Sequence, residues 1–188
     1  MDLTAHLLSE VCKDVAVVPK LNELSGETFP LRSTNVSDEA RLDVSARGVW
    51  TRYQRAFFYI RVFDPLARRY QDQTLRQAYL TNEKKKKRHY NARILEVENG
   101  TFTPLVFSVY GGMGNECQIF MKRLSLLLSE KRAENYSMMS TWIRTKLSFA
   151  LLRSCLMCIR GSRHHFYRPN ITETDVEIDV RETTIKSI

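Results

Sequence analysis

The sequence predicts a mixed α/β domain. Apolar residues recur at helical spacing in some segments and at strand spacing in others. These segments follow one another as a helix, three strands, a helix, a strand and two helices, an order that places helices against the faces of a sheet. With 43% hydrophobic residues in 188, the chain can bury the core of a single domain.

The first half supplies the first helix and three strands. Leucine and valine recur every three or four positions over residues 2–13, which predicts an amphipathic helix. A valine-rich strand over 15–18 ends at Pro19. The polar residues 22–39 predict a loop. Two further strands are expected near 40–46 and 55–63, joined by a turn around Gly48.

The second half is expected to complete the domain with three helices and one strand. A long helical pattern covers 72–98, and a buried strand over 103–110 leaves through the glycine-rich turn 111–114. Helices are predicted near 115–132 and 137–160. Residues 1–161 therefore form the predicted domain. Residues 162–188 are expected to be a weakly structured acidic tail, although the alternation over 175–180 also permits an edge strand.

Two neighbouring strands carry polar residues that need an explanation. Alternation in the strand 55–63 places Tyr59 and Arg61 on one face and Phe58 and Ile60 on the other. A charged Arg61 among apolar neighbours is costly unless it faces a polar cleft or a partner. Asp43 lies in the preceding strand segment, where its simplest role is to cap a turn.

This order of elements, with Asp43 on one strand and Tyr59-Ile60-Arg61 on the next, resembles the PD-(D/E)XK nuclease superfamily. More closely, the chain is similar to the C-terminal nuclease-like region of reverse-transcriptase-bearing mobile elements in invertebrate genomes. The resemblance implies a restriction-endonuclease-like core, α-β-β-β-α-β, with two additional C-terminal helices. It runs through residues 3–5, 8–12, 40–43, 56–58, 61–63, 102–108, 111–114, 122–124, 147–154 and 158–163.

The resemblance assigns roles to individual residues. Asp43 matches the metal-binding Asp of the motif, and Arg61 takes the position of the motif's Lys. Glu10 matches an acidic residue that some members use as an additional metal ligand, on a first helix that we expect to be truncated. Lys86 and Tyr90 match the polar-plus-Tyr pair that other members project toward the site or the phosphate backbone. As residues one helical turn apart, they also share a face of their helix.

The implied function is metal-dependent cleavage of DNA with Mg²⁺ or Mn²⁺. The departure is Tyr59, since relatives have Asp in its place. Phosphodiester hydrolysis needs a cation held by carboxylates, and a neutral phenol is a poor ligand for a hard cation. We therefore expect impaired catalysis at Asp43, Tyr59 and Arg61. Two alternatives stay open, which are a non-catalytic nucleic-acid-binding domain and a non-functional mobile-element relic.

The charge of the chain favours a polyanionic partner. The net charge is +8, and five consecutive basic residues lie on the long helix, namely Lys84, Lys85, Lys86, Lys87 and Arg88. Because this run winds around the helix, only part of it can face one partner, and it is otherwise a solvated surface. The expected partners are a nucleic acid and the remainder of a retroelement polyprotein. DNA is the nucleic acid that we expect.

The sequence also bears on location. No stretch approaches the roughly 18 apolar residues of a membrane span, and the acidic start is unlike a signal peptide. Four cysteines without secretory features predict reduced thiols in an intracellular protein. A nuclear location follows only if the partner is DNA.

Overall fold

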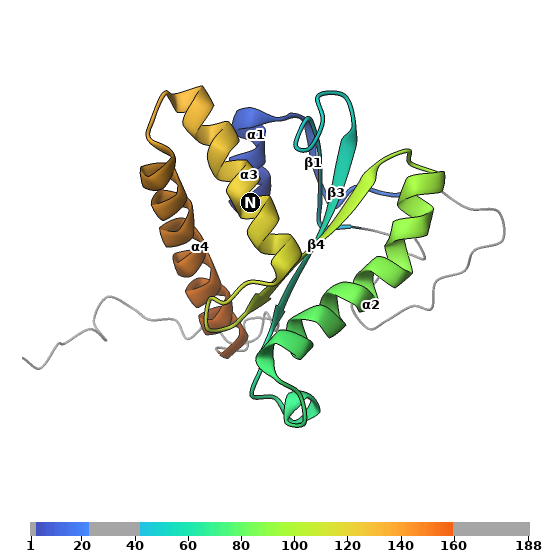
Figure 1. The fold of residues 1–188 in the computed structure, drawn as a ribbon, viewed down its shortest axis with the longest axis vertical. Coiled ribbons are helices and arrows are strands. Elements are labelled where there is room, and N and C mark those ends of the chain that lie inside the picture. The colour runs from blue at the N-terminus through green and yellow to red at the C-terminus, as the bar shows by residue number, and fades with distance from the viewer. Residues whose placement is uncertain (1–2, 23–41, 160–188) are drawn as a thin grey trace, which may run out of the picture.

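The computed structural model describes residues 3–22 and 42–159, which form a four-stranded mixed sheet with helices on both faces (Figure 1). The predicted mixed α/β class and the predicted order of elements are confirmed. Of the predicted loop 22–39, residues 23–39 lie outside the described residues, as does the predicted tail 162–188. The elements are α1 Leu3–Val11, β1 Lys13–Val17, β2 Val44–Arg47, β3 Arg55–Phe63, the 3-10 helix η1 Arg68–Tyr70, α2 Leu75–Glu96, β4 Thr101–Ser108, α3 Asn115–Arg132 and α4 Tyr136–Ile159.

The start of α2 shows why its boundary differs from the predicted residue 72. Thr74 and Gln77 form a capping box, in which the Thr74 hydroxyl accepts from the Gln77 backbone N–H at 3.3 Å. The Gln77 side chain in turn accepts from the Thr74 backbone N–H at 2.8 Å. This reciprocal pair satisfies two donors that a helix start leaves open. In the same connection the Asp64 carboxylate accepts from Leu66 N at 2.9 Å, so Asp64 begins a turn.

The sheet has the order β1-β2-β3-β4. The pairs β1–β2 and β2–β3 are antiparallel, whereas β3 and β4 are parallel. Parallel neighbours cannot be joined by a tight turn and need a crossover connection. The helix α2 supplies that crossover and therefore lies across one face of the sheet (Figure 1).

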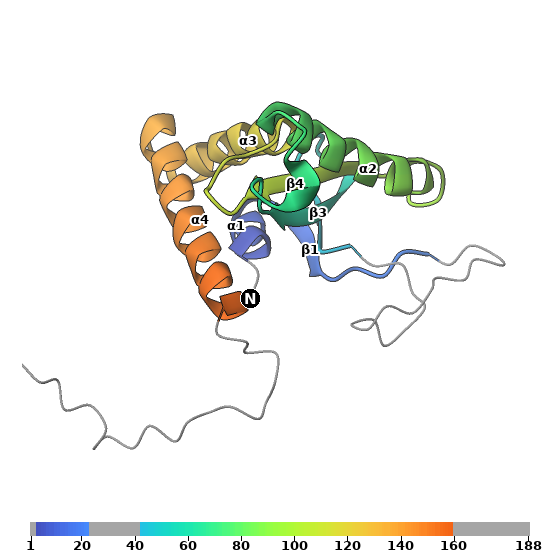
Figure 2. The same ribbon diagram turned by 90° about the horizontal axis from the view of Figure 1, so that it is seen from below.

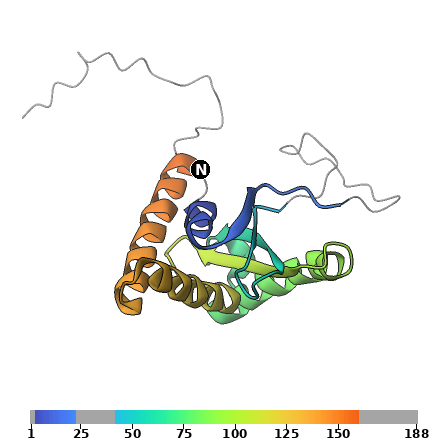
Figure 3. The same ribbon diagram turned by 90° about the horizontal axis from the view of Figure 1, so that it is seen from above.

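Side-chain alternation divides the core between the two faces. Phe57 and Phe102 pack with Ile94 of α2, and Phe63 and Val106 pack with Tyr79 of the same helix. On the other face, alternate strand residues join a larger cluster with α1, α3 and α4, which lie together on that side (Figures 2 and 3). The strand residues in this larger cluster are Val44, Ala46, Ala56, Phe58, Leu105 and Phe107.

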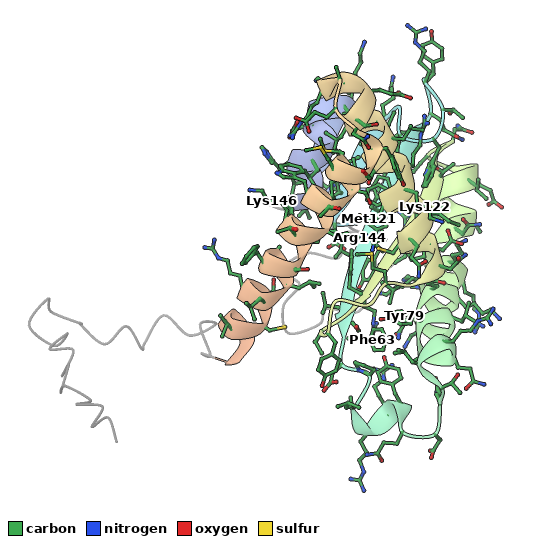
Figure 4. All side chains as sticks on the ribbon, turned by 60° about the vertical axis from the view of Figure 1, so that its left-hand side comes forward. Phe63, Tyr79, Met121, Lys122, Arg144 and Lys146 are labelled. Atoms are coloured by element: carbon green, nitrogen blue, oxygen red, sulfur yellow. The ribbon has the colours of Figure 1, made fainter. Side chains whose placement is uncertain are left out.

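Aromatic contacts fix the helices on the sheet. The Phe58 and Phe120 rings lie with centroids 4.8 Å apart, which holds α3 against the centre of β3. Phe63 of β3 and Tyr79 of α2 meet edge to face at 5.1 Å and lie next to each other in Figure 4. Such pairs stabilise packing by about 0.5–1.5 kcal/mol beyond their buried area. Among the residues described, no helix combines the length and the apolar character that crossing a membrane requires.

The first turn of α3 depends on a carboxylate from α2. Glu83 is buried, and its Oε1 accepts from Glu116 N at 3.1 Å near the helix start. Gly114 precedes this turn, and a Cβ at that position would collide with Glu83 Oε1. A side chain at this position would therefore displace the Glu83 carboxylate from its hydrogen bond with Glu116 N. Burial raises the pKa of the Glu83 carboxyl, and the hydrogen bond from Glu116 N offsets only part of the rise.

We predict that Glu83→Gln removes a pH-dependent loss of stability. Because the folded protein holds the Glu83 proton more tightly than the unfolded chain, the free energy of unfolding falls as pH rises through the raised pKa. The amide retains an oxygen acceptor for Glu116 N and carries no charge. In urea unfolding from pH 4 to pH 8, the stability of Glu83→Gln relative to the natural chain should rise with pH. Glu130→Gln, at an exposed position of α3, is the control, and a pH-independent difference for Glu83→Gln would contradict this account.

Candidate functional site

The motif residues on the strands meet on the sheet face that α2 covers. Asp43 directly precedes β2, and continuing the Val44–Phe58 register places Asp43 opposite Tyr59. The Asp43 N–H donates to Phe58 O at 3.1 Å, and its Oδ2 accepts from Ile60 N at 2.6 Å. The carboxylate is thus held at the edge of β3 beside Tyr59, with one oxygen engaged by the backbone.

Tyr59 is covered by two side chains of α2. The Lys86 ammonium lies 3.8 Å from the centroid of the Tyr59 ring and 5.7 Å from that of Tyr90. The Tyr59 and Tyr90 rings stack at 6.1 Å, and Tyr90 continues the contact to Phe102 at 5.5 Å. We call Tyr59, Lys86 and Tyr90 the Tyr59 stack. A cation over an aromatic face is attracted by about 0.5–2 kcal/mol, so Lys86 is held beside the position expected to carry a carboxylate.

Several buried polar atoms on this face have no hydrogen-bond partner in the part of the chain that the structure describes. They include Arg61 Nε, Ser45 Oγ and the Tyr79 hydroxyl. They give polar character to an otherwise apolar sheet face. Ser45 and Tyr79 belonged to no recognised motif. Ser45 lies two positions after Asp43, and side chains two positions apart in a strand share a face. This spacing is the sequence feature that predicts the place of Ser45.

Glu10 is not brought to Asp43. Its carboxylate binds Arg132 through two nitrogens, with Arg132 Nη2 at 2.7 Å from Oε2 and Nε at 3.1 Å from Oε2. Lys131 also donates to the Glu10 carbonyl oxygen, and the Arg132 guanidinium lies 4.4 Å from the Trp142 ring centroid. These contacts join α1 to α3 and α4, on the face of the sheet opposite α2. Glu10 is therefore placed as a structural residue.

The Asp43 carboxylate lies on a face that also carries cations, a setting that opposes the approach of Mg²⁺. Within residues 3–22 and 42–159, no three His, Cys, Asp or Glu side chains gather closely enough to hold a metal ion. Asp43 has the Tyr59 ring as its neighbour on β3, and Lys86 and Arg61 bring two positive charges to the same face. Mg²⁺ binds through one or two carboxylates, and nearby cations oppose its approach.

The five consecutive basic residues of α2 do not all face solvent, as the winding of the helix predicts. Lys84, Lys85 and Arg88 are exposed to solvent. Lys86 is half-buried against Tyr59, and Lys87 forms an ion pair with Glu116 at 2.5 Å. Three cations of the run are thus presented outward beside the Tyr59 stack. Such an arrangement suits contacts with phosphate oxygens, which position a nucleic acid without selecting its sequence.

Comparison of the chain with protein-family models, with curated proteins and with solved structures finds no match. Among the described cysteines, Cys12, Cys117 and Cys155 are free thiols. Cys117 is a core residue, and its burial raises the pKa of the thiol. The thiol is therefore a poor nucleophile.

We predict that Glu10 and Arg132 are energetically coupled. Glu10→Ala should destabilise the domain because it leaves the half-buried Arg132 guanidinium without its carboxylate partner. In a double-mutant cycle with Arg132→Ala, urea unfolding should give a coupling free energy of about 1 kcal/mol. Arg132→Lys, which keeps the charge and loses the forked geometry, should retain part of the coupling. Strictly additive effects of the two alanine substitutions would show that the pair contributes nothing.

Proposed function

We propose that this chain is a nuclease-like domain of retroelement origin that binds nucleic acid without hydrolysing it. The nucleic acid we expect is DNA. The strand order supports a restriction-endonuclease-like core, because three antiparallel strands precede a crossover helix and a fourth strand parallel to the third. This order aligns Asp43, Tyr59 and Arg61 on one sheet face, where the PD-(D/E)XK motif residues would be needed.

The contact between Lys86 and Tyr59 carries the proposal. In a hydrolase the Tyr59 position would supply a carboxylate to a cation that polarises the phosphate and activates water. Here an aromatic ring fills the position, and an ammonium lies 3.8 Å from its centroid. The single carboxylate of Asp43 gives one oxygen to Ile60 N. Among the described residues, the face therefore sets cations that attract a phosphate beside the single motif carboxylate of Asp43.

The exposed side of α2 supports binding of a polyanion. Lys84, Lys85 and Arg88 extend the positive charge of Lys86 and Arg61 along the helix. Each phosphate that such cations neutralise releases condensed counterions, so affinity falls as salt concentration rises. Nucleic acid is the partner that supplies phosphates at this density.

We predict that the natural chain leaves supercoiled plasmid intact with Mg²⁺ or Mn²⁺, while Tyr59→Asp nicks it. The introduced carboxylate provides the missing ligand, and Asp43→Ala in the Tyr59→Asp background should abolish nicking. Lys86 could hold the introduced carboxylate in an ion pair, so Tyr59→Asp combined with Lys86→Gln should nick faster than Tyr59→Asp alone.

Asp43-dependent cleavage by the natural chain would contradict the proposal. Failure of every variant to cut, with all resistant to limited proteolysis, would remove the nuclease-like assignment and leave only binding to be tested. Rapid digestion of the natural chain would instead indicate a non-functional relic.

We predict that replacing Lys84, Lys85 and Arg88 by alanine weakens DNA binding and lowers its salt dependence. Loss of up to three phosphate contacts should reduce the slope of log K against log salt by about 2–3. The matched control replaces three exposed cations of α3 and α4 on the other side of the sheet, Lys122, Arg144 and Lys146 (Figure 4). Fluorescence anisotropy with a labelled duplex measures both. Equal losses in the two triple variants would show non-specific charge attraction rather than an interface on α2.

A further inference from the structure

A positively charged pocket lies at the opposite end of β2 from Asp43. It has a volume of about 560 Å³ and is lined by Lys13, Asp14, Arg47, Arg52, Tyr53 and Arg123, together with Val11 and Gly48. Four of these residues are cations and one is an anion, and Asp14 pairs with Arg47 at 3.4 Å. The lining therefore carries a net charge of three positive units, which favours an anion in the pocket.

The backbone at the rim of the pocket departs from regular strand geometry. The pairing of β1 with β2 shifts register between Lys13 and Ala16, as at a β-bulge. Within that irregularity Asp14 has a φ of 50°, a left-handed conformation that costs a non-glycine residue free energy. Bulges re-aim side chains out of the regular alternation of a strand. Lys13 and Asp14 both line the pocket from this segment.

The loop between β2 and β3 is fixed at its base. Val49 is buried, and its carbonyl oxygen accepts from Arg123 Nε at 2.8 Å. Trp50 packs edge-on against Phe120 at 6.4 Å, and Gly48 N donates to Gln54 O at 3.3 Å. These contacts tie the loop to α3 and leave little freedom to its base.

The tip of this anchored loop presents an aromatic ring to solvent. Tyr53 is 78% exposed, and the Arg52 guanidinium lies 5.6 Å from its ring centroid. A large exposed ring on a fixed loop, directly beside a basic pocket, is a platform on which a flat ligand can stack. A simple inorganic anion would use the cations and leave the ring without a role.

We propose that this pocket is a second nucleic-acid contact, which receives a backbone phosphate of a single-stranded segment while the adjacent base stacks on Tyr53. The inference rests on the proposed nucleic-acid binding and adds strand selectivity to it. Single strands alternate phosphates with unpaired bases, the chemistry that the cations and Tyr53 provide. In a duplex the bases are stacked on one another, so Tyr53 has no exposed base face to engage.

The test compares a labelled single-stranded oligothymidine with a duplex of equal length by fluorescence anisotropy. Tyr53→Ala should weaken single-strand binding about tenfold, and Tyr53→Phe should restore it because the ring is kept. Duplex binding should be unchanged by Tyr53→Ala. Lys13→Ala combined with Arg52→Ala should lower the salt slope for the single strand by about 0.7, the contribution of one single-strand phosphate. Arg47 and Arg123 are left intact because they hold Asp14 and the loop.

The outcomes separate this inference from the proposed function. If the natural chain binds neither oligonucleotide, the proposed function fails, and the inference about the pocket fails with it. If the α2 triple variant loses binding while the Tyr53 and Lys13/Arg52 variants match the natural chain, only the pocket inference is overturned. Equal weakening of single-strand and duplex binding by Tyr53→Ala would also overturn it, because the stacking would not be specific for unpaired bases.

Discussion

The parallel pairing of β3 with β4 is the constraint on which the rest of the molecule depends. It requires a crossover, and α2 crosses the sheet so that Lys86 and Tyr90 reach Tyr59. With one face covered by α2, the helices α1, α3 and α4 pack on the other. The buried Glu83 carboxylate of α2 then reaches the first turn of α3, which links the helices of the two faces.

The electrostatic character of the site follows from this packing. A hydrolytic centre of the expected kind concentrates carboxylates, whereas this face concentrates cations around one carboxylate. The Tyr59 ring makes that distribution stable, because it offers the Lys86 ammonium an aromatic face in place of an anionic partner. The same charges that disfavour Mg²⁺ favour the phosphates of a nucleic acid. In the proposed function, loss of hydrolysis and retention of binding are thus two consequences of one arrangement.

The features that could be predicted from the sequence follow from the local spacing of apolar and polar residues. The alternation of Phe57 to Phe63 placed Tyr59 and Arg61 on one face, and apolar spacing located α3 and α4 to within a residue of their ends. The spacing of Lys86 and Tyr90 predicted a shared face, and both contact Tyr59. Contacts between distant segments were beyond such patterns. Glu10 meets Arg132 across 122 positions, and the basic pocket collects residues from three separate parts of the chain.

The most direct measurement follows the Ile60 amide, which donates to the Asp43 carboxylate and would lie next to any metal bound there. In ¹H–¹⁵N spectra of the natural chain, titration with Mn²⁺ should leave the Ile60 signal no broader than those of exposed surface amides. Addition of an oligonucleotide without metal should shift signals around Lys86 and Tyr90. Selective broadening of Ile60 by Mn²⁺, abolished by Asp43→Asn, would demonstrate a metal centre at Asp43 and contradict the account.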